Sequence, residues 1–471
     1  MASIGSALNN MTSALEADQS ALNVMANNVS NASVTGYTRE VAVFEENSPV
    51  TLNGQSYGQG VTMTGAVSQR DLVLDQRIQQ QTQAESSSDS QLTALNNLQS
   101  YFTPASGTSA SASAGNIGTD ITKFFSSFSE LEANPADNSL RQNVLSTATT
   151  LAGDISNTSA SVNSQRSSLN QQALSVVGQV NSLTSSLAQL NHQIQSTSPN
   201  QDAGTLEDQR QQDLLQLSQL IGINTTTTEG NGMTISTTSG AVLVSQGQSY
   251  TLGTSVSNGV YQITSASGTN ITSSVASGGG SLGGLLTARD TDLPEVSAQL
   301  DQLAYNVSIA VNAQNNSGSD VNGNTGNEDM FAEPTQVAGA AINMSVVMTD
   351  PEQIAAAAVG AGTGDDANAV AMAAIGNTTI VGGSTPSNAY SNMVSGLGSL
   401  VAETTNLNTA QQASVAQLTN LNNTNSAVDL NEEAAQLTTF ERAYQSASQA
   451  FSMLNTLYAS ALNLGVSTAV S

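Results

Sequence analysis

The two ends of the chain carry the same pattern of apolar and polar positions. In the last helical run, over residues 428–464, the apolar side chains fall at Leu430, Leu437, Phe440, Tyr444, Ala447, Phe451, Leu454, Tyr458 and Ala461. Residues 1–30 follow the same rule at Ile4, Leu8, Met11, Leu15, Leu22, Met25 and Val29, with Asp18 as the one polar intruder. Alternating steps of three and four keep one stripe of a helix turned toward a partner helix.

Neither terminal helix shows a second apolar face or a neighbouring strand on which it could pack. A stripe this narrow stabilises a helix only when another element covers it. We therefore expect helices 1–30 and 428–464 to pair as a coiled coil that neighbouring subunits bury further. An internal helix of an ordinary bundle would show the same periodicity, so spacing alone leaves both arrangements open.

Between the terminal helices the pattern changes several times. Residues 31–66 are punctuated by glycines around short β-prone pieces at 41–44 and 61–63. Helical spacing returns at Val67, and a second helical block covers about 119–220. That block contains an unbroken four-three seam at Leu169, Ala173, Val176, Val180, Leu183, Leu187, Leu190 and Ile194. Long helices joined by short loops are typical of an elongated bundle.

Residues 222–280 differ from their surroundings because Thr, Ser, Val, Ile and Gly dominate. Apolar and polar residues alternate between turn signals, which favours an antiparallel β domain. Its predicted strands lie at 233–237, 241–245, 260–264 and 270–275. Helix returns at about 293–314 and 391–420, and the Gly-, Asn- and Ala-rich residues between them form a variable insert.

This order predicts a mainly α fold with an inserted β domain, drawn out as an elongated multi-domain rod. A terminal α-helical coiled coil, a helical bundle and an antiparallel β domain would follow one another along it. The expected domains are the coiled coil from 1–66 with 426–471, the bundle from 67–221 with 281–316 and 386–425, the β domain at 222–280, and an insert at 317–385 packed on or near the β domain.

Charge limits the possible partners. The 471 residues include 9 Lys and Arg against 36 Asp and Glu, a net charge of −27. Such a chain repels a phosphate backbone and an anionic membrane surface, so we expect no nucleic-acid partner and no membrane insertion. No apolar run reaches the length of a membrane span, and no basic and apolar leader opens the sequence. Cysteine is absent, so folding requires no oxidising compartment.

Two motifs resemble a catalytic site and a cofactor-binding site, but each lacks a residue or a structural context that its function needs. The G-x-S-x-G pattern at 279–283 needs a downstream histidine, whereas the only histidine, His192, lies upstream in a helical seam. The glycines at 278, 280 and 283 match a dinucleotide fingerprint without the surrounding βαβ alternation. A tight turn before a helix explains these glycines better. Neither pattern therefore predicts a catalytic residue or a cofactor.

The remaining acidic motifs predict no metal site either. Residues 320–324 begin like a calcium loop, but Thr325 and Phe331 stand where an EF-hand needs glycine and glutamate. Glu432 and Glu433 open a helix, where negative charge suits the helix dipole. We expect a capping role for this pair and a protein that is not an enzyme.

Five stretches together resemble one family. Residues 27–39, N-N-V-S-N-A-S-V-T-G-Y-T-R, are similar to the rod/hook signature of flagellar axial proteins. Residues 279–290 and 300–304 are similar to the central block of the flagellar hook-associated protein 1 (FlgK) family. The segments 208–215 and 430–445 fit the same family. The N-terminal motif is shared by many axial proteins, whereas the central block is more specific.

The resemblance implies a structural adaptor at the hook–filament junction of the bacterial flagellum, exported through the type III channel without a cleaved signal peptide. Its implied partners are like subunits in a ring, the hook protein, hook-associated protein 3, and an export chaperone at the C-terminal helix. A secreted adhesin or effector that uses the β domain as a binding head is the alternative. The location of the protein, at the junction or away from the flagellum, would distinguish the adaptor from the adhesin or effector.

The heptad pattern of the terminal helices and the motif at 27–39 together predict which residues contact neighbouring subunits. They are Leu8, Met11, Leu15, Leu22, Met25, Asn28, Asn31, Gly36, Tyr37, Arg39, Leu437, Phe440, Tyr444, Phe451, Leu454 and Tyr458. Among them Gly36 is expected to occupy a bend with positive φ, which glycine adopts without strain.

Overall fold

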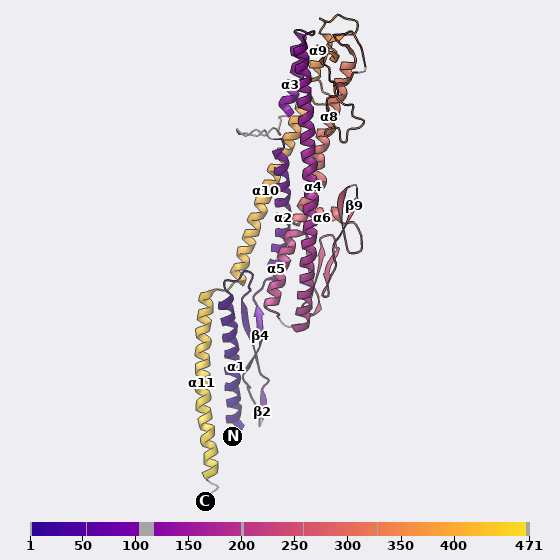
Figure 1. The fold of residues 1–471 in the computed structure, drawn as a ribbon. Helices are drawn as coiled ribbons and strands as arrows, with labels where there is room; N and C mark the ends of the chain where they lie inside the picture. Colours follow the sequence, from indigo (N-terminus) through magenta and orange to yellow (C-terminus); the bar gives the residue numbers. More distant parts are fainter. Residues whose placement is uncertain are drawn as a thin grey trace.

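The protein is an elongated rod with a narrower helical unit at one end (Figure 1). This computed structural model describes residues 2–52, 54–102, 117–198, 202–257, 259–326 and 328–467. Helices dominate, and the small sheets are antiparallel. The predicted fold class, mainly α with an inserted β domain in an elongated rod, is therefore confirmed.

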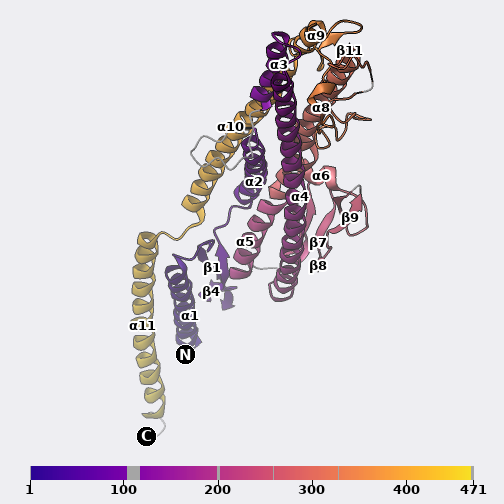
Figure 2. The same cartoon turned by 45° about the horizontal axis from the view of Figure 1, so that its top comes forward.

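The narrow end, which we call the terminal unit, joins the two ends of the chain. Helix α1 (Ala2–Asn31) and helix α11 (Leu430–Ser467) lie side by side and run in opposite directions (Figures 1 and 2). An arm of strands lies on the other side of α1. In the arm β1 (Glu40–Glu46) pairs with β4 (Val61–Ser68), and β2 (Val50–Leu52) pairs with β3 (Gln55–Tyr57).

The arm corrects two predictions. β1 and β4 pack against α1, so the expectation that no strand lies near the terminal helices is wrong. Val67 does not begin a helix but pairs with Val41 across the β1–β4 ladder. Helix α2 (Leu72–Ser100) starts only after Asp71, whose side chain accepts hydrogen bonds from the backbone N–H groups of Val73 and Leu74. This N-cap ends the strand segment and fixes the start of the helix.

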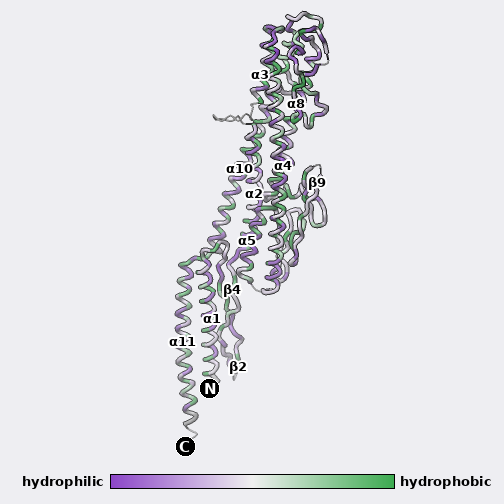
Figure 3. Tube along the Cα trace, in the orientation of Figure 1, coloured by the Kyte–Doolittle hydropathy of each residue, from purple (hydrophilic) through white to green (hydrophobic). Residues whose placement is uncertain are grey.

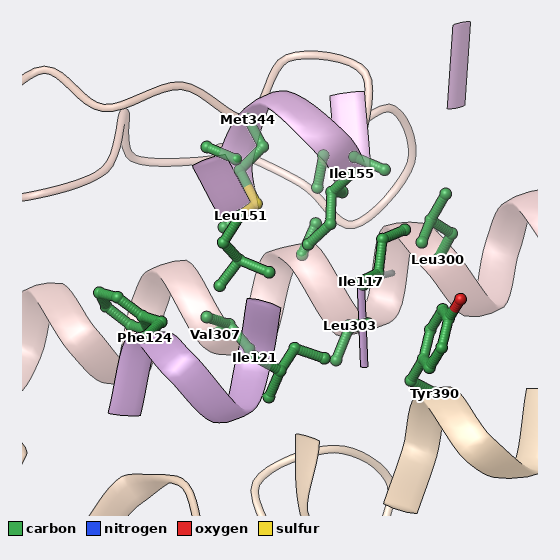
Figure 4. Close-up of a cluster of buried hydrophobic side chains, with 14 of the residues drawn as sticks. Ile117, Ile121, Phe124, Leu151, Ile155, Leu300, Leu303, Val307, Met344 and Tyr390 are labelled. Carbon is green, nitrogen blue, oxygen red and sulfur yellow. The ribbon is translucent and has the colours of Figure 1, made fainter. Parts of the chain in front are cut away.

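The rod is built from long helices. Besides α2, they are α3 (Ile117–Glu132), α4 (Asn138–Thr197), α5 (Thr205–Leu220), α8 (Leu293–Asn316) and α10 (Pro386–Ser426). The short α7 (Gly280–Thr287) and a π turn (Ala288–Asp292) connect the β segment to α8. Side chains from α3, α4, α8 and α10 meet in one buried cluster that includes Phe124, Leu151, Leu303 and Tyr390 (Figure 4).

The β segment lies on one flank of the rod. A four-stranded sheet has the order β5 (Ile223–Thr227), β6 (Met233–Thr237), β7 (Val242–Ser245) and β8 (Gln248–Ser249). A hairpin of β9 (Gly253–Ser257) and β10 (Val260–Thr264) follows. The strand predicted at 270–275 is wrong, because α6 (Thr272–Ala276) forms there. Asn270 Oδ1 accepts hydrogen bonds from the backbone N–H and hydroxyl of Thr272, which turns the chain into that helix.

The glycine-rich residues after α8 contain little regular structure. They include β11 (Gly318–Ser319), a 3-10 turn (Pro351–Gln353), β12 (Ala357–Ala358) and α9 (Ala367–Ile375). Helix α9 packs against α3 and α8 at the far end of the rod, whereas the sequence prediction put this insert on or near the β domain (Figure 1). The buried guanidinium of Arg141 on α4 donates to the carbonyl oxygen of Ile354 at 2.6 Å and so ties the insert to the rod.

Hydropathy alternates along the helices (Figure 3). Within the described part of the chain, no helix combines the length and the apolar character that crossing a bilayer demands.

Candidate subunit interface and the joint that holds it

The signature loop after α1 is organised around the side chain of Asn28, which is only 1% exposed. Its Nδ2 donates to the carbonyl oxygen of Glu40 at 2.8 Å and to Glu433 Oε2 at 3.2 Å. Its Oδ1 accepts from the Tyr37 hydroxyl at 2.9 Å and from the Glu40 backbone N–H at 3.0 Å. One amide thus ties the end of α1, the loop and the start of α11 together.

Arg39 makes the second connection between the chain ends. Its Nε lies 2.7 Å from Glu433 Oε1, and one terminal nitrogen lies 3.0 Å from Glu432 Oε1. Its backbone N–H also donates to the carbonyl oxygen of Ser426 at 2.9 Å. Glu432 and Glu433 lie in the first turn of α11, where negative charge interacts favourably with the helix dipole. Their ion pairs with Arg39 could not be predicted from the sequence pattern.

The same loop is bound to the rod on its other side. The backbone N–H of Thr38 donates to Asp208 Oδ2 at 3.0 Å. Asp208 also pairs with Arg70 at 2.6 Å, and Gln212 Nε2 donates to the carbonyl oxygen of Thr35 at 2.7 Å. Residues 35–40 therefore form a joint that is clamped between α11 and α5.

Gly36 adopts φ +80° in this joint, so the predicted positive φ is confirmed. A Cβ atom at this position would overlap with the side chain of Gln212. Backbone conformation and close packing both demand glycine here. Asn31, by contrast, lies outside the joint, because its Nδ2 donates only to Asn27, at the backbone oxygen and at Oδ1.

Burial shapes the electrostatics of the joint. Burial, reinforced by the charges of Glu40, Asp208 and Glu433, raises the pKa of Tyr37 to about 12. The phenol therefore stays protonated and keeps donating to Asn28 at physiological pH. Burial of Glu40, with Asp202 and Asp208 nearby, also raises the pKa of that carboxyl. Arg39 binds Glu432 and Glu433 directly, and Arg70 binds Glu207 and Asp208, so these four carboxylates are offset by paired cations.

The heptad seam runs between α1 and α11, but one partner helix covers it only in part. Met25 is buried and Tyr444 remains 38% exposed. The other seam candidates, all half-buried, are Leu8, Met11, Leu15, Leu22, Leu437, Phe440, Phe451, Leu454 and Tyr458. Phe440 stacks on Phe44 of β1, with ring centroids 6.0 Å apart. Side chains left half-covered in one chain can be buried further by other subunits.

Two features of the terminal helices, buried alanines in α1 and exposed apolar residues in α11, were not predicted from the sequence. Ala17 and Ala21 are the most deeply buried apolar residues of α1, at 3% and 0% exposure, although the heptad spacing does not include them. Helix α11 also carries a second apolar face, because Met453 is 63% exposed and Leu457 is 58% exposed. The expectation that neither helix has such a face is therefore wrong for α11.

The glycine motif before α7 serves packing. Gly279 and Gly280 have φ values of +97° and +73°, and a Cβ at Gly284 would overlap with the backbone of Ser87 on α2. Ser281 Oγ is buried and has no hydrogen-bond partner, while His192 lies against Gly247 in the β7–β8 turn. Nothing in this arrangement activates the serine. Within the described ranges, moreover, no three His, Asp or Glu side chains gather as metal ligands do.

Comparison with known proteins agrees with this geometry. Residues 107–331 match the family model described as flagellar hook-associated protein FlgK helical domain, and residues 8–38 match that of the flagella basal body rod protein. Flagellar hook-associated protein 1 of Escherichia coli (strain K12) is 26% identical, over 98% of this chain and 100% of its own length. The chain is therefore similar to flagellar hook-associated protein 1 along nearly its whole length.

Two other matches cover most of the chain. Flagellar hook-associated protein 1 of Bacillus subtilis (strain 168) is 26% identical, with 96% of each chain covered. A solved structure of the flagellar hook junction protein FlgK from Burkholderia pseudomallei is similar in fold, with a TM-score of 0.64 and 20% identity. That match covers 74% of this chain and 99% of the other. Its similarity to proteins named flagellar hook-associated protein 1 indicates a structural component of the flagellum.

Proposed function

We propose that the chain is the adaptor at the hook–filament junction, where a ring of its copies joins the hook protein to hook-associated protein 3. In this proposal the terminal units assemble side by side into the inner layer of the junction, and the rod and β segment point outward. The resemblance of both chain ends and the central block to this family supports that placement.

The observation that carries the proposal is the incomplete cover of the terminal unit. A pair of helices with half-buried seam residues and an exposed Tyr444 has stripes that further subunits can bury. Burying an apolar side chain completely is worth about 1.5–3 kcal/mol relative to exposing it. The joint explains how each unit is presented, because Asn28 and Arg39 bind it to Glu433 of α11 while Asp208 of the rod accepts a hydrogen bond from Thr38.

Export belongs to the same proposal. We propose that the chain leaves the cell unfolded through the flagellar type III channel, with a chaperone holding its C-terminal helix beforehand and no signal peptide removed. A chain without cysteine has no disulfides to obstruct unfolding. The exposed apolar residues of α11, Met453 and Leu457 among them, are a hydrophobic surface that a chaperone could cover.

The proposed role is structural rather than enzymatic, and it requires no cofactor. The relatives named flagellar hook-associated protein 1 are structural flagellar proteins, which favours this interpretation. An activity that depended on Ser281 would contradict it.

The test is localisation together with loss of function. A fluorescent or gold label on the β9–β10 hairpin, far from the terminal unit, should mark one band between hook and filament. Cells lacking the protein should build hooks but shed filament protein into the medium. Label along the filament, or a free extracellular pool with normal motility in its absence, would refute the junction role and favour a secreted adhesin.

A further inference from the structure

The terminal unit exposes two apolar surfaces that the α1–α11 seam does not use. The first is the outer face of α11, formed by Met453 and Leu457, which are 63% and 58% exposed. The second is the outer end of the arm, where Val50, Tyr57 and Val61 are 43%, 48% and 37% exposed. Exposed apolar groups of this size that gather in a patch mark interaction sites.

The two elements that carry these surfaces, α11 and the arm, lie on opposite sides of α1 (Figures 1 and 2). Both views show the order α11, α1, arm across the unit (Figures 1 and 2). Although Phe44 of the arm stacks on Phe440 of α11, the arm of the same chain leaves Met453 and Leu457 exposed. A pair of unlike surfaces on opposite sides of one molecule can pair head to tail between copies, and such pairing closes into rings or continues as helical arrays.

The two surfaces also lie at a similar height along the unit. Asn28 and Glu433 are hydrogen-bonded at the joint, and α1 and α11 descend from there together. Asn10 lies 18 positions before Asn28, about 27 Å below the joint at 1.5 Å per residue. Met453 and Leu457 lie 20 and 24 positions after Glu433, about 30 and 36 Å below the joint, so the two surfaces overlap in height to within about two helical turns. Asn10 Nδ2 donates to the carbonyl oxygen of Gly58 at 3.0 Å, which fixes the arm at that height.

The distribution of charged residues along the chain indicates which molecule covers these surfaces. Copies of a chain with a net charge of −27 repel one another wherever their acidic residues meet. Residues 47–69 and 443–471 contain no charged side chain at all, and they include both surfaces. Two apolar, uncharged patches at similar height on a strongly acidic chain suit a second copy of that chain.

We propose that the outer face of α11, at Met453 and Leu457, packs against the arm of the neighbouring copy at Val50, Tyr57 and Val61. This contact rests on the proposed ring assembly and names the surfaces through which it is made. It is distinct from the α1–α11 seam, which lies within each chain.

Thiol cross-linking tests the contact directly, because the chain contains no cysteine and therefore gives no background. Cells lacking the native protein would produce two variants together, Leu457→Cys and Tyr57→Cys, and their isolated flagella would be treated with a short bifunctional maleimide. We expect a cross-linked dimer only when both variants are present. The matched control pairs Leu457→Cys with Val256→Cys on β9, which at 63% is more exposed than Tyr57 at 48% and should still give no dimer.

Each outcome bears on one of the two proposals. Flagella that contain both variants at the junction but yield no dimer would refute this contact and leave the junction role standing. A dimer from Leu457→Cys alone would also refute it, because like faces would then meet. Absence of the protein from the junction, with motility unchanged, would remove the proposed function and this contact with it.

A charge exchange supplies an independent readout. Leu457→Lys or Tyr57→Asp alone should reduce motile cells at least tenfold, because each puts an unpaired charge into an apolar contact. Leu457→Lys combined with Tyr57→Asp should recover part of that loss, since the two charges would face each other between copies. A double variant no better than the worse single variant would contradict the contact.

Discussion

Asp75 offers a quantitative test of how α2 and α10 are held together. Its side chain, 6% exposed, lies in the first turn of α2. Oδ1 accepts a hydrogen bond from Asn422 Nδ2 of α10 at 3.3 Å, and Oδ2 is buried without a hydrogen-bond partner. Burial raises the pKa of Asp75 from 3.8 to about 6, although Arg70 and Asn422 act in the opposite direction.

The sign of the pH dependence follows from this shift. A raised carboxyl pKa means that folding favours the protonated acid, so its contribution is complete below pH 3.8 and is lost as pH rises through about 6. A difference of about two pKa units corresponds to roughly 3 kcal/mol. We therefore expect Asp75→Asn, which has the same shape without the charge, to stabilise the rod by up to about 3 kcal/mol at pH 7.5 and by almost nothing at pH 4.

The assay is thermal unfolding of both proteins at the two pH values, followed by circular dichroism. The quantity of interest is the difference in Tm between variant and wild type, because other titrating groups cancel in it. We expect a rise of several degrees at pH 7.5 and none at pH 4. Asp366→Asn, an exposed residue before α9, is the matched control and should give no pH-dependent difference. A lower Tm for Asp75→Asn at pH 7.5 would refute the reasoning.

Three further predictions concern the terminal unit. Gly36→Val forces a branched side chain into φ +80° and against Gln212, so motility should be lost at normal export levels; normal swimming would contradict this role. Glu433→Ala leaves Arg39 with only Glu432 and should destabilise the start of α11 by at most about 3 kcal/mol, seen as faster proteolysis there, whereas unchanged cleavage would show that the pair is dispensable. Leu454→Asp puts a charge into the half-buried seam and should abolish filament attachment while the β segment stays folded, in contrast to Ser452→Asp on the exposed side.

Local patterns in the sequence determined the helices and many of the strands. The spacing of apolar residues placed α1 and α11 close to their observed limits, and the strands at 233–237 and 260–264 have the predicted bounds. Gly36 could be assigned a positive φ from its position in a bend. These predictions succeed because helix and strand periods, turn residues and glycine conformations depend on neighbouring residues.

Tertiary structure decided the features that join distant parts of the chain. Arg39 and Glu433 are 394 positions apart, and the acidic pair looked like a helix cap until the fold brought Arg39 to it. Val67 had helical spacing but lies in β4, since Val41 offered a ladder partner. The exposure of Met453 and Leu457 on α11 could be recognised only after the packing of α1 against α11 was known. Contacts of this kind depend on which surfaces meet in space, and periodicity along one segment carries no information about the partner segment.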